Sequence, residues 1–349
     1  MRNKVVAFKI QTVQMKNYGN ILKFECDRFS NINLIIGENS TGKTFILKAL
    51  YSAVRSMEEY KRGDDVRSMC EILSEKLRWT FQVDRLGDLV KRSALDDLEF
   101  KIKTNGAEIG LEYQFSQSAN TKVRNVKAPK MQKKGNSIFI PAKEVLSLFP
   151  VILKSREIDK SFGFDDTYYD LAKALRMIPP KEEEHCILTK IRKELKNVIQ
   201  GRVDYDENTG KWYYKNDEGQ KFAIGATAEG VKKISMMDRL FANGYINGDS
   251  VLFIDEIESA LHPKAICEFL DMIASVSHEM GIQFFLSTHS YFVIKKLFLI
   301  AQKQPDLVTC ISLSKDKMPY VCNLTEEMPE NSIIQASIDL YKEEIMEVL

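Results

Sequence analysis

Both ends of the chain show the alternation of apolar and polar positions that is typical of α/β proteins. Near the N-terminus, the segments KVVAFKIQTVQM, ILKFEC and INLII predict short strands, and a helix is predicted from about Thr44 to Met57. From Ser250 onward the pattern predicts a strand, a helix, a strand, a helix, two strands and a last helix. The runs VLFI and IQFFL have no polar face, so they predict strands buried on both sides, as in a parallel sheet.

The middle of the chain predicts helices mixed with hairpins. Residues 64–98 have an amphipathic helical pattern, and residues 98–115 alternate around an Asn-Gly turn, which predicts a hairpin. Residues 145–200 are mostly helical, with breaks at Pro179–Pro180 and at the acidic run Glu182–Glu184. The segment DYDENTGKWYY predicts a second hairpin.

We therefore predict an α/β fold with a mixed sheet core and a large helical and β insertion. The alternation of strands and helices at the two ends is interrupted by the hairpins and helices of the middle. A single unit covers residues 1–349: its N-terminal lobe takes about 1–60, its C-terminal lobe about 222–349, and the insertion about 61–221.

Composition adds few restrictions. The 349 residues are 44% hydrophobic and carry a formal net charge of +1, so any contact with nucleic acid requires a local basic patch. Six scattered cysteines without a C-x-x-C pair predict reduced thiols rather than a disulfide framework or a zinc site. No apolar run approaches the ~20 residues that span a bilayer, so we expect a cytoplasmic protein without a membrane partner.

Residues 37–44, GENSTGKT, match the phosphate-loop pattern G-x-x-x-x-G-K-[ST] in full. The two glycines let the loop curl so that backbone N–H groups point at phosphate oxygens. The lysine puts a positive charge beside the β and γ phosphates, and the threonine hydroxyl is a ligand of Mg²⁺. A turn that binds nothing is the alternative, but the strand predicted before it and the helix predicted after it favour a nucleotide site. The candidate cofactor-binding residues are Gly37, Asn39, Ser40, Thr41, Gly42, Lys43 and Thr44.

Two carboxylates follow the buried run VLFI and need a positive partner there. In phosphate-loop proteins the acid that ends the neighbouring strand holds Mg²⁺, so we assign Asp255, together with Thr44, to the metal. Glu256 can orient and deprotonate the attacking water. The alternative is that both acids only cap the following helix. Because the chain also holds a phosphate loop, we favour ATP and Mg²⁺ as the cofactors.

Three further motifs follow the order found in a known family. They are TAEGVKK at residues 227–233, ESALHP at 258–263 and STHS at 287–290. Together with the phosphate loop and the acidic strand, they resemble the ABC-type ATPases, specifically the SMC-like, RecF-like and OLD-type branch. The resemblance covers nearly the whole chain and implies an ABC-type P-loop ATPase head.

The resemblance implies that ATP lies between two copies of the chain, in a homodimer or a higher oligomer. Each site would combine the phosphate loop of one copy with the helix after TAEG of the other, and Gly230 would face the γ-phosphate of the partner's ATP. His289 would be the switch residue that touches the γ-phosphate. The implied catalytic residues are Lys43, Glu256 and His289.

The sequence departs from the family pattern in two places. Ala228 and Glu229 stand where the family's signature has serine and glycine, so the serine contact is lost, and Thr227 is the candidate substitute. The family's Q-loop glutamine has no clear match. Gln132 and the segment near Pro141 are the two alternatives.

The segments FIPAKEVLS, TYYDLAKAL, AEGVKK and GIQFFLSTHSYF also resemble stand-alone AAA-family ATPases of bacterial anti-phage defence systems. Such ATPases accompany a separate effector, often a nuclease. OLD-type proteins carry a nuclease after the ATPase, but the segment that follows His289 is too short for one, so we expect a separate effector. The implied function is a switch in which ATP-dependent head association controls that effector or a DNA transaction.

Two other functions stay open at this point. One is the nucleotide-binding subunit of a transporter, which the degenerate signature and the long insertion disfavour. The other is a P-loop kinase, in which the helix after TAEG and His289 would have no role.

Two surface segments are candidates for partner contacts. The run KVRNVKAPKMQKK, residues 122–134, holds six basic residues and no acid. Direct DNA contact there is the alternative to a solvated loop, with Lys130, Lys133 and Lys134 as the residues to test. The C-terminal segment IIQASIDLYKEEIMEVL is amphipathic, and we expect it to pack on its own lobe rather than dock a partner.

Overall fold

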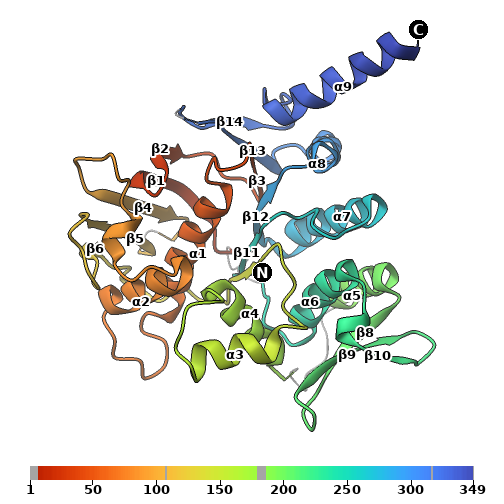
Figure 1. Ribbon diagram of the computed structural model, residues 1–349, viewed down its shortest axis with the longest axis horizontal. Coiled ribbons are helices and arrows are strands. Elements are labelled where there is room, and N and C mark those ends of the chain that lie inside the picture. Colours follow the sequence, from red (N-terminus) through yellow and green to blue (C-terminus); the bar gives the residue numbers. More distant parts are fainter. Residues whose placement is uncertain (1–6, 107, 179–185, 316, 349) are drawn as a thin grey trace, which may run out of the picture.

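A six-stranded sheet runs through the centre of the computed structural model, which describes residues 7–106, 108–178, 186–315 and 317–348 (Figure 1). The strand order is β14-β13-β3-β12-β11-β7. Neighbouring strands pair in parallel from β13 to β7, and β14 is antiparallel to β13, so the sheet is mixed, as predicted. The strands are β3 (Ile32–Gly37), β7 (Ile138–Ile140), β11 (Val251–Ile254), β12 (Gln283–Thr288), β13 (Val308–Leu313) and β14 (Tyr320–Asn323).

A second, antiparallel sheet covers one face of the central sheet together with helix α1. Its strand order is β2-β1-β4-β5-β6. The hairpin predicted over residues 98–115 is confirmed as β4 and β5, and β4 pairs with β1. The elements are β1 (Ile10–Tyr18), β2 (Ile21–Cys26), α1 (Lys43–Glu59), β4 (Leu98–Thr104), β5 (Gly110–Phe115) and β6 (Arg124–Lys127).

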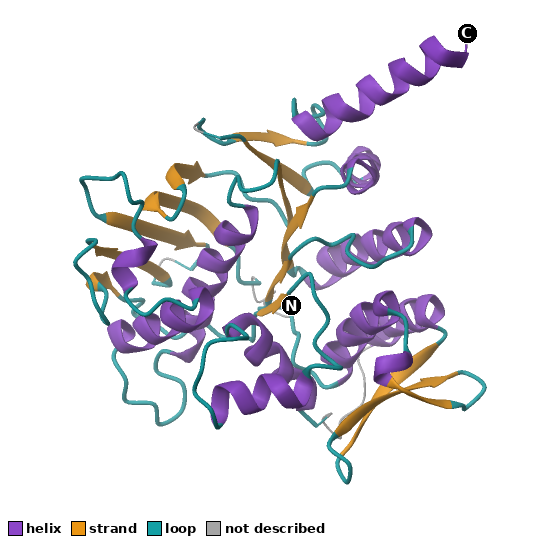
Figure 2. Ribbon diagram, viewed as in Figure 1, coloured by secondary structure: helices purple, strands orange, loops and turns teal. Residues whose placement is uncertain are grey.

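Most other helices lie on the opposite side of the central sheet (Figure 2). The second predicted hairpin is confirmed as β8 and β9, which form a small sheet with β10. The predicted breaks at Pro179–Pro180 and Glu182–Glu184 fall outside the described residues. The elements are α3 (Phe149–Glu157), α4 (Asp166–Arg176), α5 (Cys186–Ile199), β8 (Gly201–Asp206), β9 (Lys211–Asn216), β10 (Lys221–Ala223), η2 (Ile224–Ala226), α6 (Glu229–Ala242), α7 (Pro263–Met280), α8 (Tyr291–Lys303) and α9 (Ser332–Val348).

Successive residues of the central strands enter two separate cores. Alternate side chains of a strand point to opposite faces of its sheet. Leu34 of β3 joins the core beneath the helices, whereas Ile35 joins the core beneath the second sheet. Leu252 and Phe253 of β11 divide in the same way. Both faces need apolar side chains, which explains why the sequence of these strands lacks a polar face.

The helix predicted over residues 64–98 is wrong in its length. α2 spans Met69–Phe81, and only a short 3₁₀ helix, η1 (Leu86–Leu89), follows it. Ser68 fixes the start of α2, because its hydroxyl accepts the Glu71 N–H while the Glu71 carboxylate accepts the Ser68 N–H. Gln82, with φ 52° in the left-handed region, ends the helix.

The expectation that the C-terminal helix packs along its own lobe is wrong beyond the first turn. Ile333 and Ile334 pack against the core, but α9 then projects away from the body (Figure 1). Tyr341 is 63% exposed and Met346 is 82% exposed.

Within the described part of the chain, no helix combines the length and the apolar character that a membrane crossing requires.

The basic run 122–134 forms the edge strand β6 and its connection to β7. Lys127 pairs with Glu112 at 2.7 Å, on the exposed surface. Lys133, in contrast, is fully buried, and its Nζ lies 2.6 Å from Glu58 Oε1 at the end of α1. The alternative in which Lys133 contacts DNA is therefore wrong for this residue.

Lys133→Met should lower the free energy of unfolding by about 3 kcal/mol, because Glu58 would remain charged inside the protein with one cation fewer. Arg55, 2.7 Å from Glu58, would still hold that charge in place. Urea denaturation measures the change. The matched control is Lys134→Met at an exposed position, which should stay within about 0.5 kcal/mol of the parent. Equal losses in the two variants would contradict the buried pair.

Candidate nucleotide-binding site

The predicted site residues gather at the carboxyl edge of the central sheet. Because β3, β11 and β12 are parallel, their last residues meet at one edge. The phosphate loop follows β3, the acidic pair follows β11, and His289 follows β12. Segments that lie far apart in the sequence therefore come together here.

The loop after β3 has the backbone of a phosphate cradle. Gly42 has φ 99° and Ser40 has φ 65°, so the chain curls through the left-handed region. A Cβ added to Gly37 would lie 2.6 Å from the Leu313 carbonyl oxygen, so only glycine fits there. α1 starts at Lys43, and no described side chain caps its first turn. Its free N–H groups and its dipole are available to an anion.

Lys43 and Thr44 begin α1 on the inner side of the loop. The Lys43 ammonium donates to the carbonyl oxygens of Gly37 at 2.8 Å and Glu38 at 2.9 Å. Burial lowers the pKa of Lys43, and the nearby carboxylates of residues 255, 256 and 258 oppose that shift. The loop carbonyls thus hold a cation at the place where the phosphates of a nucleotide would lie.

Thr44 and Asp255 lie in direct contact. The Thr44 hydroxyl is 2.9 Å and 3.0 Å from the two carboxylate oxygens of Asp255, and Ser287 Oγ donates to Asp255 Oδ1 at 2.5 Å. Hydroxyl and carboxylate oxygens are the hard donors that Mg²⁺ prefers, with phosphate and water completing its shell. No cluster of three or more acidic, histidine or cysteine side chains that could hold a metal occurs in the described residues. Thr44 and Asp255 therefore fit a metal ion whose other ligands come mainly from a bound nucleotide.

Glu256 and His289 form the outer part of the site. Their side chains are partly exposed, and His289 Nε2 lies 3.9 Å from Glu256 Oε1. Glu256 has φ 43°, in the left-handed region, and its N–H donates to Ser287 Oγ at 2.9 Å. The strand ends thus bring together the proposed base and the proposed switch residue.

Three residues make contacts in the site that are not evident in the sequence. Glu258 accepts the His289 N–H at 2.7 Å and the Thr288 hydroxyl at 2.8 Å, so it fixes the end of β12. Ser287 Oγ donates to the Asp255 carboxylate and accepts the Glu256 N–H, and Lys233 of α6 donates to the Glu256 carbonyl oxygen at 2.8 Å. All three residues lie inside the quoted motifs, but the motifs do not indicate these partners.

Gly230 lies in the first turn of α6, next to the loop 255–262. A Cβ on Gly230 would lie 2.7 Å from the Ala260 carbonyl oxygen. No side chain among the described residues caps the start of α6, where Ala228 is the N-cap. The Thr227 hydroxyl donates to the Ala223 carbonyl oxygen at 3.3 Å. The contact of Gly230 with a partner's ATP stays a prediction.

The two Q-loop alternatives lie in different places. Asp255 N–H donates to the Ile140 carbonyl oxygen and Ser259 Oγ to that of Ala142, so the segment near Pro141 borders the site. Gln132 instead donates to the Glu58 carbonyl oxygen at the far end of α1, about 22 Å along the helix from Lys43. The choice of Gln132 as a nucleotide contact is therefore wrong.

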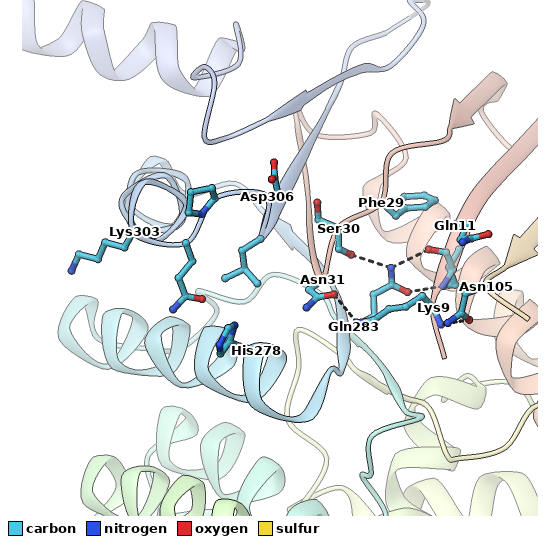
Figure 3. Close-up of a pocket in the computed structure, with 14 residues that line it drawn as sticks. Lys9, Gln11, Phe29, Ser30, Asn31, Asn105, His278, Gln283, Lys303 and Asp306 are labelled. Carbon is cyan, nitrogen blue, oxygen red and sulfur yellow. Dashed lines mark hydrogen bonds between the residues drawn. The ribbon is translucent and has the colours of Figure 1, made fainter. Parts of the chain in front are cut away.

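A cavity of about 330 Å³ opens beside the phosphate loop, lined by Thr41, Phe24 and Lys91 among others. A larger cavity of about 720 Å³ lies at the opposite edge of the sheet, with Gln283 and Lys9 in its wall (Figure 3). β12 begins at Gln283, so its length separates the two edges by about 20 Å. The chemistry of the loop, rather than cavity size, marks the nucleotide site.

Comparisons with known proteins give a matching family and a relative that matches in part. A profile of the family described as "AAA domain, putative AbiEii toxin, Type IV TA system" matches residues 32–295. The DNA replication and repair protein RecF of Bacillus cereus (strain G9842) is 34% identical over 103 residues, which are 29% of this chain and 25% of that protein. The match thus spans about a quarter of the length of this curated relative.

The chain is also similar to solved structures of SMC heads. The SMC head bound to the C-winged helix domain of ScpA has a TM-score of 0.50 and 13% identity, over 90% of this chain and 97% of that chain. The SMC head domain from Thermotoga maritima has a TM-score of 0.47 and 12% identity, over 90% of this chain and 98% of that chain. At 13% identity the likeness to the ScpA-bound head concerns the fold alone, and it confirms the predicted ABC-type head.

Ser287→Ala should reduce the rate of ATP hydrolysis about tenfold and raise the Mg²⁺ concentration needed for half-maximal rate. The reason is that this hydroxyl orients both Asp255 and the Glu256 backbone, and loss of such supporting contacts costs about 10- to 100-fold at metal sites. Phosphate release at varied Mg²⁺ measures the effect. Ser290→Ala is the control, because that hydroxyl caps no described helix N–H. An unchanged Mg²⁺ dependence of Ser287→Ala would count against the metal assignment.

Proposed function

The chain belongs to the AAA-domain family described as putative AbiEii toxin, Type IV TA system, and from this premise of a P-loop ATPase we propose a nucleotide-driven switch. Two copies close face to face on ATP and Mg²⁺, and hydrolysis lets them separate. The two states control a separate effector protein, which we expect to be a nuclease in phage defence. Without nucleotide the copies have no shared ligand to hold them together.

The observation that carries the proposal is the cluster of Lys43, Thr44 and Asp255 at the uncapped start of α1. Bound Mg²⁺ would neutralise charge on the β and γ phosphates. Lys43 can turn its ammonium from the loop carbonyls to those phosphates. Thr44 and Asp255 would hold the metal, and Glu256 would accept the proton of the attacking water. His289, close to Glu256, would contact the same γ-phosphate.

The start of α6 supplies the argument for two copies. The free N–H groups at the start of α6 can bind an anion. The phosphate loop of the same chain leads into α1, so the nucleotide that it binds lies at the start of α1 and not at the start of α6. A second copy can offer a bound γ-phosphate there. Closure would then depend on the γ-phosphate and end with its release.

The helical arm of α3 and α4 is the part of the insertion that can follow the nucleotide. Lys48, one turn after Thr44, lies 2.6 Å from Asp165, whose carboxylate caps α4. Tyr51, further along α1, donates to Asp170 of α4 at 2.6 Å. Movement of α1 would therefore reach the arm, which we propose as the surface that signals to the effector.

A relative supports the idea of a separately encoded partner. The solved SMC head with TM-score 0.50 is bound to the C-winged helix domain of ScpA. A head of this fold can thus hold a second protein. For the present chain we propose an effector in a comparable role, without assigning it to the same surface.

Glu256→Gln should trap the closed pair, because it keeps the ligands for ATP and Mg²⁺ but removes the base. Sedimentation velocity should show a particle of about twice the mass with ATP and Mg²⁺, and a single chain with ADP. Lys43→Ala in the same background should remain a single chain with either nucleotide. A mass that does not change with nucleotide would rule out the switch.

Lys48→Met should weaken the response of the arm to ATP while ATP hydrolysis continues. Among the described residues the Lys48 ammonium bonds to Asp165 and to no residue of the loop 37–44, so we expect ATP hydrolysis within about twofold of the parent. The arm loses this charged link to α1 and keeps the longer pair of Arg55 with Asp170 at 3.7 Å. Hydrogen exchange of residues 149–176 with and without ATP measures the coupling, which should weaken in the variant. Lys154→Met, on an exposed face of the arm, is the control. Identical ATP-dependent protection in Lys48→Met and the parent would contradict this route.

A further inference from the structure

Lys233 is a buried lysine that the proposed reaction does not use. It lies one turn after Gly230 on α6, is 3% exposed, and donates to the Glu256 carbonyl oxygen at 2.8 Å. No carboxylate of the described residues forms an ion pair with it. Burial lowers its pKa to about 8, against the opposing charges of Glu258, Asp255 and Glu256. Such a buried ammonium is costly, and its contact points to a task at the Glu256 backbone.

The neighbouring lysine shows that burial alone does not explain this contact. Lys232 is buried too, but it pairs with Glu229 at 2.7 Å and receives further support from Glu144 at 3.8 Å. Its ammonium therefore has the carboxylates that a buried cation normally requires. Of the two lysines, Lys233 alone is directed at the backbone next to the proposed metal ligand.

The backbone that Lys233 holds is strained. Glu256 is a non-glycine residue with φ 43°, and Ala260 in the same loop has φ 63°. Such conformations persist only where the surroundings fix them. Ser287 holds the Glu256 N–H and Lys233 holds the Glu256 carbonyl, so the residue is clamped from both sides.

α6 contacts the strained loop at a second point. The Ala260 carbonyl oxygen lies where a Cβ of Gly230 would need space, so the first turn of α6 rests directly on it. One rigid helix therefore touches both left-handed residues of the loop. A shift of α6 along its axis would have to move Glu256 and Ala260 together.

We propose that Lys233 is a positioning residue through which ATP bound to the partner copy sets the conformation of Glu256 in its own chain. The inference rests on the proposed function, because it needs the start of α6 to face the partner's γ-phosphate. The phosphate holds α6, Lys233 carries its position to the Glu256 carbonyl, and the carboxylate then aligns with its own attacking water. Each site would become competent only when the other site is filled.

The first test compares cooperativity in Lys233→Met, Lys233→Arg and Lys232→Met. The parent should hydrolyse ATP with a Hill coefficient approaching the number of coupled sites, about 2. Lys233→Met should fall to about 1 with kcat reduced about tenfold and KM within about twofold. Lys233→Arg, which keeps a donor, should recover part of both. Lys232→Met, which removes a buried ammonium without a contact to Glu256, should keep the parental Hill coefficient. Parental cooperativity in Lys233→Met, or its loss in Lys232→Met, would overturn the proposal.

The second test determines in which of the two copies Lys233 acts on ATP hydrolysis. Mixed pairs, isolated with two affinity tags, carry Glu256→Gln in one copy, so only the other copy hydrolyses ATP. Lys233→Met in the hydrolysing copy should reduce the rate about tenfold, whereas Lys233→Met in the Glu256→Gln copy should leave the rate of the hydrolysing copy unchanged. If Lys233 acted by contacting the partner's ATP, the two results would be exchanged, and the proposal would be wrong.

The two proposals fail in different ways. A parent protein that neither hydrolyses ATP nor associates with it would contradict the proposed function. A parent that does both, with cooperativity that survives Lys233→Met, would contradict only the role of Lys233.

Discussion

The carboxylate of Asp255 is the constraint around which the site is arranged. It follows a strand buried on both faces and is itself 7% exposed, so its charge needs donors from the protein. Ser287, at the end of β12, and Thr44, at the start of α1, supply them. That solution requires β12 to lie between β3 and β11, which is the observed strand order. The sheet topology and the chemistry of the site therefore have one common cause.

Where the sequence carries local signals, the structure follows them. The phosphate loop needs glycine at defined backbone angles, so its pattern predicts position and conformation together. The central strands are also predictable, because both of their faces must be apolar. Contacts such as Lys233 with the Glu256 carbonyl depend on how distant segments pack, and a linear pattern contains no record of that.

The errors have the same origin. Lys133 belongs to a run that is basic in sequence, yet it turns inward to Glu58 because that acid is buried at the end of α1. α9 has an apolar stripe, but only its first turn meets its own lobe. The helix predicted over residues 64–98 stops at Gln82, where one residue in the left-handed region redirects the chain. In the first two cases a tertiary contact, or its absence among the described residues, overrides a local preference.

The altered signature becomes understandable from the same geometry. A serine at the N-cap of α6 could accept a hydrogen bond from a backbone N–H of its own first turn. Ala228 stands at that N-cap and has no side-chain oxygen, so the N–H groups of the first turn stay available to an external anion. Gly230 must remain small because it rests on the Ala260 carbonyl, whereas the half-exposed Glu229 side chain is turned away from the anion site to pair with the buried Lys232. The backbone of α6 can therefore keep the anion site after the signature side chains have changed, provided that its contacts with the loop 255–262 are kept.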